Sequence, residues 1–167
     1  MNNKDLPDIS LRRYTMDDAD ITLALFQRAV REVASRDYTP AQIEAWAGHI
    51  DRRVWGNNLE RQSTWVAMRE NTLAGFASLN DHGHLDMLFV SPDHQRRGVA
   101  RALLMTAEQA AWQRGMDRMT TEASLTALPF FKARGFEVVK AQEIERRGQV
   151  LKNFRMEKAL HGTGSAR

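Results

Sequence analysis

One stretch of the sequence decides the fold, residues 85–100, which reads LDMLFVSPDHQRRGVA. It opens with a strand-like apolar run, stops at the turn Ser91-Pro92, and leads through a short basic loop into a helix from about Ala100. The first turn of a helix has free N–H groups and the positive end of the helix dipole, and it binds phosphate readily. The stretch therefore predicts an anion site between a strand and a helix.

Three residues of this loop suit an anion site. Gly98 allows a close approach of the backbone or a positive φ, and Arg96 and Arg97 supply positive charge for phosphate oxygens. The loop lacks the Gly-Lys-Ser/Thr ending of the P-loop and the three glycines of the dinucleotide fingerprint. Neither of those nucleotide sites is indicated.

The segments on either side predict a series of strands and helices. A full helix joins the strands 85–90 and 118–122, which makes them a parallel pair within an otherwise antiparallel sheet. Gly56-Asn57-Asn58 breaks the helical pattern that precedes it. The expected strands are 9–14, 64–69, 73–79, 85–90, 118–122, 138–144 and 150–156, and the expected helices follow Thr15, Thr39, Gly98 and Thr126.

The composition is that of one ordinary globular domain. The 167 residues are 43% hydrophobic and 27% charged, and no stretch is apolar enough to span a bilayer. The lack of cysteine removes disulfides, thiolate metal sites and a cysteine nucleophile. Because no signal peptide is visible either, we expect a cytoplasmic protein without membrane association. The expected parts are an N-terminal extension at 1–8, the domain at 9–158 and a flexible tail at 159–167.

The charge pattern does not favour nucleic acid as a partner. The net charge is +3, but the basic residues are spread along the chain in short pairs rather than gathered on one face. A modest positive field would instead help to attract a polyanionic cofactor.

Two motifs resemble those of a known family. Gln95-x-x-Gly98-x-Ala100, after a strand that ends at Val90, resembles the coenzyme-A signature Q/R-x-x-G-x-G/A of the GNAT superfamily of N-acetyltransferases. Residues 127–136 resemble that family's "A…FY…GF" segment at the expected distance, and the order of elements matches over residues 9–158. Residues 139–158 also resemble a bacterial subgroup of uncharacterised GNAT proteins.

The resemblance implies a fold, an activity and a cofactor. The fold is α/β, with a mixed and mostly antiparallel sheet of about seven strands, a central parallel β-α-β crossover, and helices on both faces. The activity is acetylation of a primary amine by acetyl-CoA, through direct transfer in a ternary complex. A homodimer is also in keeping with the family.

Carried over residue by residue, the resemblance places the cofactor. The backbones of Leu88, Phe89 and Val90 would bond the pantetheine amides, and Ser124 takes the place of an Asn that contacts the cofactor in many members. Phe131 stands where a Tyr often protonates the leaving thiolate, which is the main departure from the pattern. The pyrophosphate would be held by Gln95, Arg96, Arg97, Gly98, Val99, Ala100 and Arg101.

Direct attack requires a neutral amine, so a group must take its proton. The candidates are His84, which falls where some members carry a catalytic Glu, together with Asp86 and Glu122. Strand alternation places His84 and Asp86 on the same face as Leu88 and Val90. Each candidate also has a structural explanation, namely a surface turn for His84, a hydrogen-bond acceptor for Asp86 and a solvated strand end for Glu122.

The missing tyrosine leaves the proton donor open. Phe131 cannot donate a proton, so Ser124 or Tyr38 could take this role, or the thiolate could leave unprotonated. His82 and His84 lack a third ligand at useful spacing, so no metal is expected.

Three functions are in keeping with the sequence. The first is acetylation of a primary amine on a small molecule. The second is acetylation of a protein N-terminus or a lysine side chain. The third is a non-catalytic coenzyme-A-binding sensor or interaction module, an interpretation that the phenylalanine at position 131 keeps open.

Overall fold

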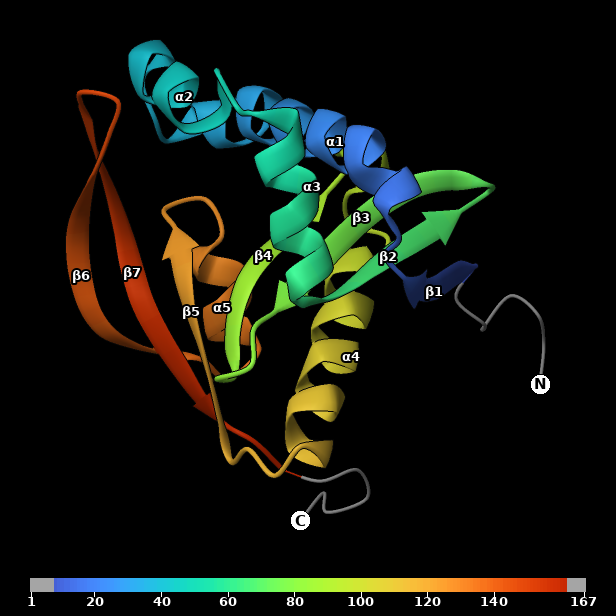
Figure 1. The fold of residues 1–167 in the computed structure, drawn as a ribbon. Helices are drawn as coiled ribbons and strands as arrows, with labels where there is room; N and C mark the ends of the chain where they lie inside the picture. Colours follow the sequence, from blue (N-terminus) through green and yellow to red (C-terminus); the bar gives the residue numbers. More distant parts are fainter. Residues whose placement is uncertain (1–7, 162–167) are drawn as a thin grey trace.

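The fold is built on a seven-stranded sheet. The computed structural model describes residues 8–161, and its strands lie in the order β1-β2-β3-β4-β5-β7-β6 (Figure 1). The expected number of strands is confirmed. The strands are β1 Ile9–Arg13, β2 Ser63–Arg69, β3 Thr72–Leu79, β4 His84–Val90, β5 Arg118–Ser124, β6 Glu137–Arg146 and β7 Gln149–Ala159.

The two central strands β4 and β5 run parallel, and α4, Val99–Gln113, makes the crossover between them. The other neighbouring strands are antiparallel. The parallel ladder is very short, because it contains only the pairs His84–Thr120 and Leu85–Thr121. Beyond Leu85 the two strands diverge, and this fork positions the functional site.

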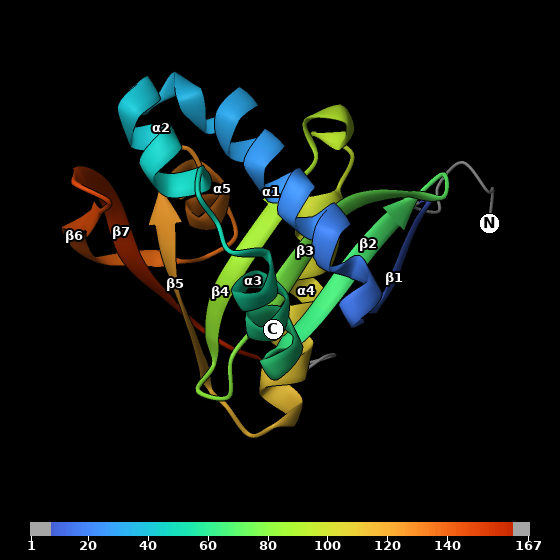
Figure 2. The same cartoon turned by 45° about the horizontal axis from the view of Figure 1, so that its top comes forward.

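Helices cover both faces of the sheet, as expected (Figures 1 and 2). The helices α1 to α3 pack on one face, and α4 and α5 pack on the other. The remaining helices are α1 Ala19–Glu32, α2 Pro40–Ala47, α3 Arg52–Arg61 and α5 Leu128–Ala133, with short 3-10 turns η2 Met16–Asp18, η3 Ala34–Arg36 and η4 Pro92–His94.

The expected break at Gly56-Asn57-Asn58 is wrong, because these residues lie inside α3. Asp51 caps the first turn of this helix. Gly56 is buried, and a Cβ at this position would lie 3.1 Å from the Cβ of Ala19. A glycine inside a helix costs about 1 kcal/mol relative to alanine, and the burial of Trp55 and Leu59 on the same helix offsets this cost.

Two of the three predicted threonine caps are correct. Thr15 caps the 3-10 turn η2 that leads into α1, and its N–H donates to Asp18 Oδ2 at 2.9 Å. Thr39 and Gln42 form the expected capping box, with Gln42 N donating to Thr39 Oγ1 at 3.2 Å and Thr39 N donating to Gln42 Oε1 at 2.8 Å. Thr126 does not cap α5, because its hydroxyl donates to Asp37 Oδ2 at 2.7 Å instead. Ala127 occupies the cap position.

Two apolar clusters hold the layers together. One lies between the sheet and α4 and α5 and includes Leu103 and Phe136, and the other lies between the sheet and α1 to α3 and includes Val30, Leu59 and Phe76. Burying one such side chain stabilises the fold by about 1.5–3 kcal/mol. The sheet is therefore fixed from both sides, and the fork between β4 and β5 has a rigid frame.

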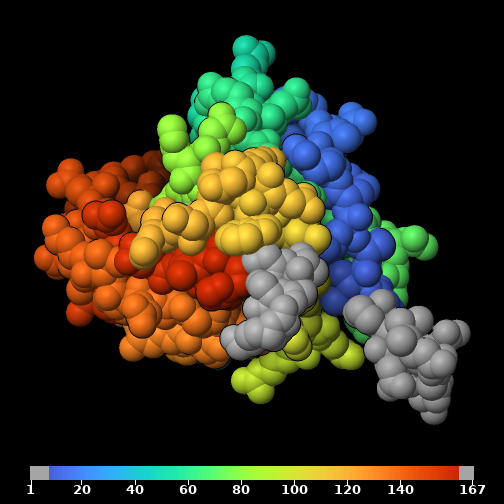
Figure 3. Space-filling view, turned by 90° about the horizontal axis from the view of Figure 1, so that it is seen from below, coloured from blue at the N-terminus to red at the C-terminus, as the bar shows by residue number. Residues whose placement is uncertain are grey.

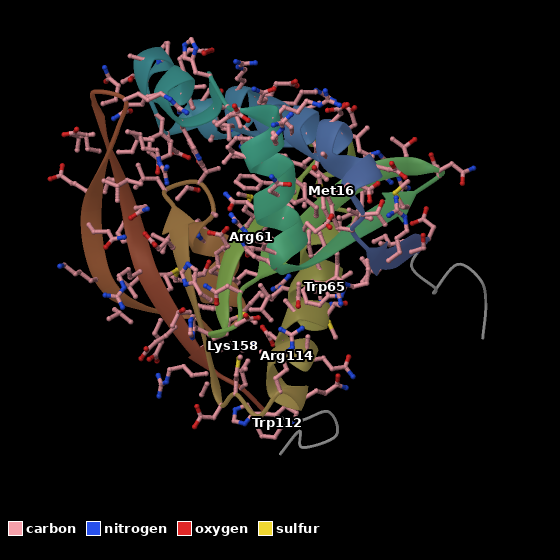
Figure 4. The ribbon with its side chains drawn as sticks, in the orientation of Figure 1. Met16, Arg61, Trp65, Trp112, Arg114 and Lys158 are labelled. Atoms are coloured by element: carbon pink, nitrogen blue, oxygen red, sulfur yellow. The ribbon has the colours of Figure 1, made fainter. Side chains whose placement is uncertain are left out.

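The packed structure extends past the expected domain end at residue 158. Leu160 is buried, and its N–H donates to Asp117 O at 2.8 Å. Lys158, labelled in Figure 4, forms an ion pair of 3.0 Å with Glu108 of α4. In Figure 3 the C-terminal strands, in orange and red, lie on one side of α4, in yellow, and the N-terminal segments lie on the other.

The predicted extension and tail lie mostly outside the described residues, since the structure does not describe residues 1–7 and 162–167. Among residues 8–161, no helix combines the length and the apolar character needed to cross a membrane.

Candidate active site

The divergence of β4 and β5 opens a cavity of about 600 Å³. Its walls are the end of β4, the loop before α4, the first turn of α4, and parts of α1 and α5. Of the residues predicted to bind the cofactor, Arg97 alone does not line it. Those that do are Leu88, Phe89, Val90, Gln95, Arg96, Gly98, Val99, Ala100, Arg101, Ser124 and Phe131.

The loop before α4 forms an open cradle. Gly98 precedes the helix with φ at +83°, and no atom lies within 4 Å of the place where a Cβ would stand. Arg96 also has a positive φ, of +60°, a strain that proteins tend to keep at functional sites. The N–H groups of the first helical turn have no acceptor within the helix. Open space, positive charge and free N–H groups fit the pyrophosphate of a coenzyme A.

Side chains on both sides of the cradle hold it in place. Arg28 of α1 donates to Glu32 at 2.8 Å and to Asp93 of η4 at 3.0 Å. This guanidinium holds the pKa of the Asp93 carboxyl below its ordinary value. On the other side, Nδ1 of the buried His94 lies 3.5 Å from Nη1 of Arg69, which belongs to β2. The loop is thus tied to α1 and to the sheet.

A second cavity, of about 470 Å³, lies on the side of the fork that faces α2 and α3. All four predicted catalytic residues line it, namely Tyr38, His84, Asp86 and Glu122. Its lining has three residues in common with the first cavity: Trp46, Phe89 and Ser124. The two cavities therefore meet at these three side chains.

The predicted face of β4 is correct for His84 and Asp86, which line the same cavity, but wrong for Leu88 and Val90, because the strand contains a β-bulge. The β3–β4 register passes from the pair Leu79–Leu85 to the pair Ser78–Met87, which leaves Asp86 as the extra residue. A bulge changes the direction of the side chains that follow. Leu88 consequently packs into the cluster beside α4, whereas Asp86 lines the cavity on the opposite face.

Three polar side chains at the base of this second cavity have defined partners. His84 Nδ1 lies 2.8 Å from Thr120 Oγ1 on the neighbouring strand. Asp86 Oδ2 accepts from the side-chain amide of Gln62 at 2.9 Å. Glu122 Oε2 accepts from the amide of Gln142 at 2.6 Å. Both carboxylates are thus held by neutral donors.

Tyr38 connects the wall of the second cavity to the sheet. Its hydroxyl donates to Lys152 O at 2.6 Å and accepts from Leu125 N at 2.9 Å, and its ring packs against Trp46. Burial raises the pKa of this phenol. The hydroxyl proton of Tyr38 is thus already shared with a backbone carbonyl.

Ser124 and Phe131 differ in their surroundings. Phe131 is buried, and its ring packs against Phe130 and Phe136 on the side of the first cavity. Ser124 Oγ accepts from Ala127 N at 3.1 Å, which leaves its own proton available for a group at the junction.

Two features of the C-terminal hairpin escaped the sequence analysis. Asn153 lines the second cavity with 9% of its surface exposed, and its Oδ1 has no hydrogen-bond partner. Arg147 donates to Ala45 O at 2.6 Å and to His49 O at 3.1 Å, so the hairpin closes against the end of α2. The sequence signal for Asn153 was its spacing: it stands two positions after the buried Leu151, and residues two apart in a strand share a face.

No cluster of three or more His, Cys, Asp or Glu side chains within residues 8–161 could hold a metal ion.

Comparisons with known proteins agree with this geometry. Residues 34–160 match the family model described as an acetyltransferase (GNAT) domain. The uncharacterised N-acetyltransferase YafP of Escherichia coli K12 is 42% identical over 93% of this chain and 96% of its own length. A GCN5-related N-acetyltransferase from Rhodopseudomonas palustris superposes with a TM-score of 0.88 at 35% identity, covering 90% of this chain and 95% of the other.

A more distant relative has a named class of substrate. YjaB of Escherichia coli K12, a peptidyl-lysine N-acetyltransferase, is 28% identical over 84% of this chain and 90% of its own length. Family and relatives together favour an enzyme over a non-catalytic module. The chain belongs to the GNAT family and is an acetyl-CoA-dependent N-acetyltransferase.

Proposed function

We propose that the protein transfers the acetyl group to a primary amine of a small molecule bound in the second cavity, directly and without an acyl-enzyme. One observation carries this proposal: the two cavities meet at Trp46, Phe89 and Ser124. A thioester on one side and an amine on the other would come together there. The lack of cysteine in the chain supports direct transfer.

The free edge of β4 supports the placement of the cofactor. Beyond Leu85 this edge has no partner strand, although Leu88, Phe89 and Val90 remain paired with β3 on their other side. An extended chain with amide groups could bond there as an added strand would. Acetyl-CoA, when bound, supplies a thioester carbon open to attack by an amine. A β4 N–H aimed at the carbonyl oxygen would stabilise the negative charge that develops on it.

We assign removal of the amine proton to His84. Its Nδ1 faces Thr120, which fixes the ring and leaves Nε2 for the acceptor side. Asp86 and Glu122 supply negative charge on the same side of the cavity, where it attracts an ammonium ion.

We assign to Ser124 the role of donating a hydrogen bond to the leaving sulfur. It lines both cavities, whereas Tyr38 lines the second alone and already donates to Lys152 O. Phe131 contributes apolar packing. A serine hydroxyl can stabilise a thiolate by hydrogen bonding without full transfer of the proton.

Closure of the C-terminal hairpin favours a small acceptor. Three hydrogen bonds join the region of α2 to the hairpin. Tyr38 donates to Lys152 O and Gln42 donates to Val150 O at 2.8 Å, whereas Arg147 of the hairpin donates to Ala45 O of α2. An extended peptide would need a groove between these elements. A small amine fits the cavity without opening it.

Release of thiol from acetyl-CoA in the presence of small primary amines tests this proposal. We expect release that saturates with amine concentration, at a rate well above that with a lysine-containing peptide. A rate that rises only with the peptide would favour lysine acetylation, the second candidate, which the name of YjaB supports. Release with neither class would count against both acceptors.

A further inference from the structure

We propose that the acceptor carries a second positive charge, so that the enzyme prefers diamines or longer polyamines to simple amines. This inference rests on the proposed function, since it places the reacting amine at the junction of the two cavities. It assigns the second ammonium group to Asp86 and Glu122.

The two carboxylates flank the fork of the sheet. The parallel ladder ends at Leu85–Thr121, and the next residues along the two strands are Asp86 and Glu122. Both line the second cavity. Neither takes part in an ion pair within the described residues, because each is held by a glutamine amide instead. Two like charges on adjacent strands are unfavourable unless a cation lies near them.

Strand alternation brings this pair together. Leu85 packs in the cluster beside α4, so the next residue, Asp86, lies on the opposite face and lines the second cavity. The bulge leaves Asp86 as the extra residue opposite β3, and bulges are common next to functional sites. Its carboxylate therefore lines the same cavity as that of Glu122 on the neighbouring strand.

A buried amide gives independent support for a ligand in this cavity. Asn153 is 9% exposed, and its Oδ1 has no partner. A buried acceptor without a hydrogen bond is costly, so a donor from the ligand would satisfy it. Asn153 stands opposite Ser124 in the β5–β7 ladder, at the level of the junction. Asn153 therefore lies at the level where the reacting amine would bind.

The spacing of these groups fits a short diamine. On β5, Glu122 lies two residues before Ser124 on the same face, which is roughly 7 Å along the strand. Extended 1,4-diaminobutane separates its two nitrogen atoms by roughly 6 Å. One amine would reach Asn153 and the junction while the other reaches the carboxylates at the fork.

A zwitterionic acceptor, such as an amino acid, fits less well. Lys152 lines the cavity, but its Nζ lies over the ring of Phe154, 5.6 Å from the centroid. Arg147 of the hairpin already donates to two backbone carbonyls. Arg146 lines the cavity but stands four residues beyond Gln142 along β6, roughly 13 Å from the level of Asn153. Arg155 faces Glu122 across the ladder, yet it does not line the cavity, and no ion pair joins them in the described structure.

Calorimetry on the enzyme saturated with coenzyme A tests the inference without turnover. The probes are butylamine, 4-aminobutanoate and 1,4-diaminobutane, which share a four-carbon chain. We expect the diamine to bind at least about tenfold more tightly than the other two. In the double variant Asp86→Asn, Glu122→Gln, the affinity for the diamine should fall at least about tenfold, toward that for butylamine, and the affinity for butylamine should fall by a smaller factor.

Asp51→Asn is the matched control. It removes a third carboxylate from the same cavity, and asparagine keeps the helix cap. It should leave the preference for the diamine intact. Equal binding of the diamine and butylamine, tighter binding of 4-aminobutanoate, or equal loss of all three probes in the double variant would overturn the inference.

Parallel measurement of thiol release from acetyl-CoA separates the inference from the proposed function. Tight binding of the diamine through these carboxylates, without release of thiol, would refute acetylation of small amines and leave the cation site standing. Thiol release with butylamine as fast as with the diamine would refute the second charge and leave the proposed function standing.

Discussion

The two cavities on either side of the fork are built in different ways. In the first, the features that suit a cofactor come from one short stretch of chain: the free edge of β4, the cradle at Gly98 and the start of α4. In the second, the polar side chains come from elements far apart in the sequence, with Tyr38, Glu122 and Asn153 among them. A backbone cradle depends on a few local residues, whereas a side-chain cavity depends on tertiary packing. We therefore expect substitutions to have separate effects on the two sides.

The largest effect is expected from Gly98→Glu on the cofactor side. The new carboxylate would stand in the open space of the cradle, where a pyrophosphate would bind. Two like charges about 4 Å apart repel each other by about 4 kcal/mol at an effective dielectric constant of about 20. We expect acetyl-CoA binding, measured by calorimetry, to weaken at least about 100-fold.

Gly115→Glu is a close control for this substitution. Gly115 has φ at +86°, and no atom lies within 4 Å of its Cβ position, so the backbone strain is alike at the other end of α4. This variant should bind acetyl-CoA as the unaltered protein does. Equal binding by both variants would place the cofactor elsewhere.

The next largest effect is expected from His84→Gln on the acceptor side. Glutamine can still bond Thr120 but cannot take a proton from the amine. We expect kcat to fall about 100-fold, with acetyl-CoA binding unchanged. Steady-state kinetics with a small amine would measure this, with His82→Gln, an exposed residue outside the cavity, as the comparison. Undiminished turnover in His84→Gln would remove it from the proton path.

A smaller effect is expected at the junction of the two cavities. Ser124→Ala removes one hydrogen bond to the leaving sulfur, so kcat should fall about threefold to tenfold. Ser124→Asn should retain most of the activity, since an amide can also donate. If alanine and asparagine at this position had the same kcat as serine, the sulfur would leave without help from residue 124.

The smallest effect on turnover is expected from Tyr38→Phe. It leaves Lys152 O and Leu125 N without a partner, so the free energy of unfolding should fall by about 1–3 kcal/mol. Turnover should stay within about twofold of the unaltered protein. Chemical denaturation and kinetics on the same preparation measure both quantities. A stable variant with kcat reduced 100-fold would make Tyr38 a proton donor after all, an effect of about 2.7 kcal/mol on the barrier.

The contrast between the cavities also explains what the sequence could predict. The cradle lies within one short stretch, so its position before α4 followed from local helix-start chemistry and a motif. The parallel pairing of β4 and β5 followed from the full helix between them. Arg97 is an exception, because it was predicted to bind the cofactor and does not line the first cavity. The orientation of one exposed side chain in a loop depends on the exact turn.

The acceptor side could be predicted only in part. His84, Asp86 and Glu122 were identified, and His84 and Asp86 line the same cavity. Leu88 and Val90 were placed on the wrong face, because alternation assumes a regular strand and the bulge at Asp86 violates it. The roles of Asn153 and Arg147 depend on how the last hairpin meets α2, a long-range contact without a local signal. Helix α3 was missed because a buried glycine within it looks like a helix breaker in isolation. The homodimer and the cytoplasmic location stay predictions.

Initial rates measured over a matrix of acetyl-CoA and amine concentrations test the central claim most directly. If the two cavities hold both reactants at once and transfer occurs where they meet, the double-reciprocal lines will intersect, and intact mass spectrometry will show no acetylated enzyme when amine is absent. Parallel lines with an accumulating acetyl-enzyme would contradict direct transfer between the two cavities.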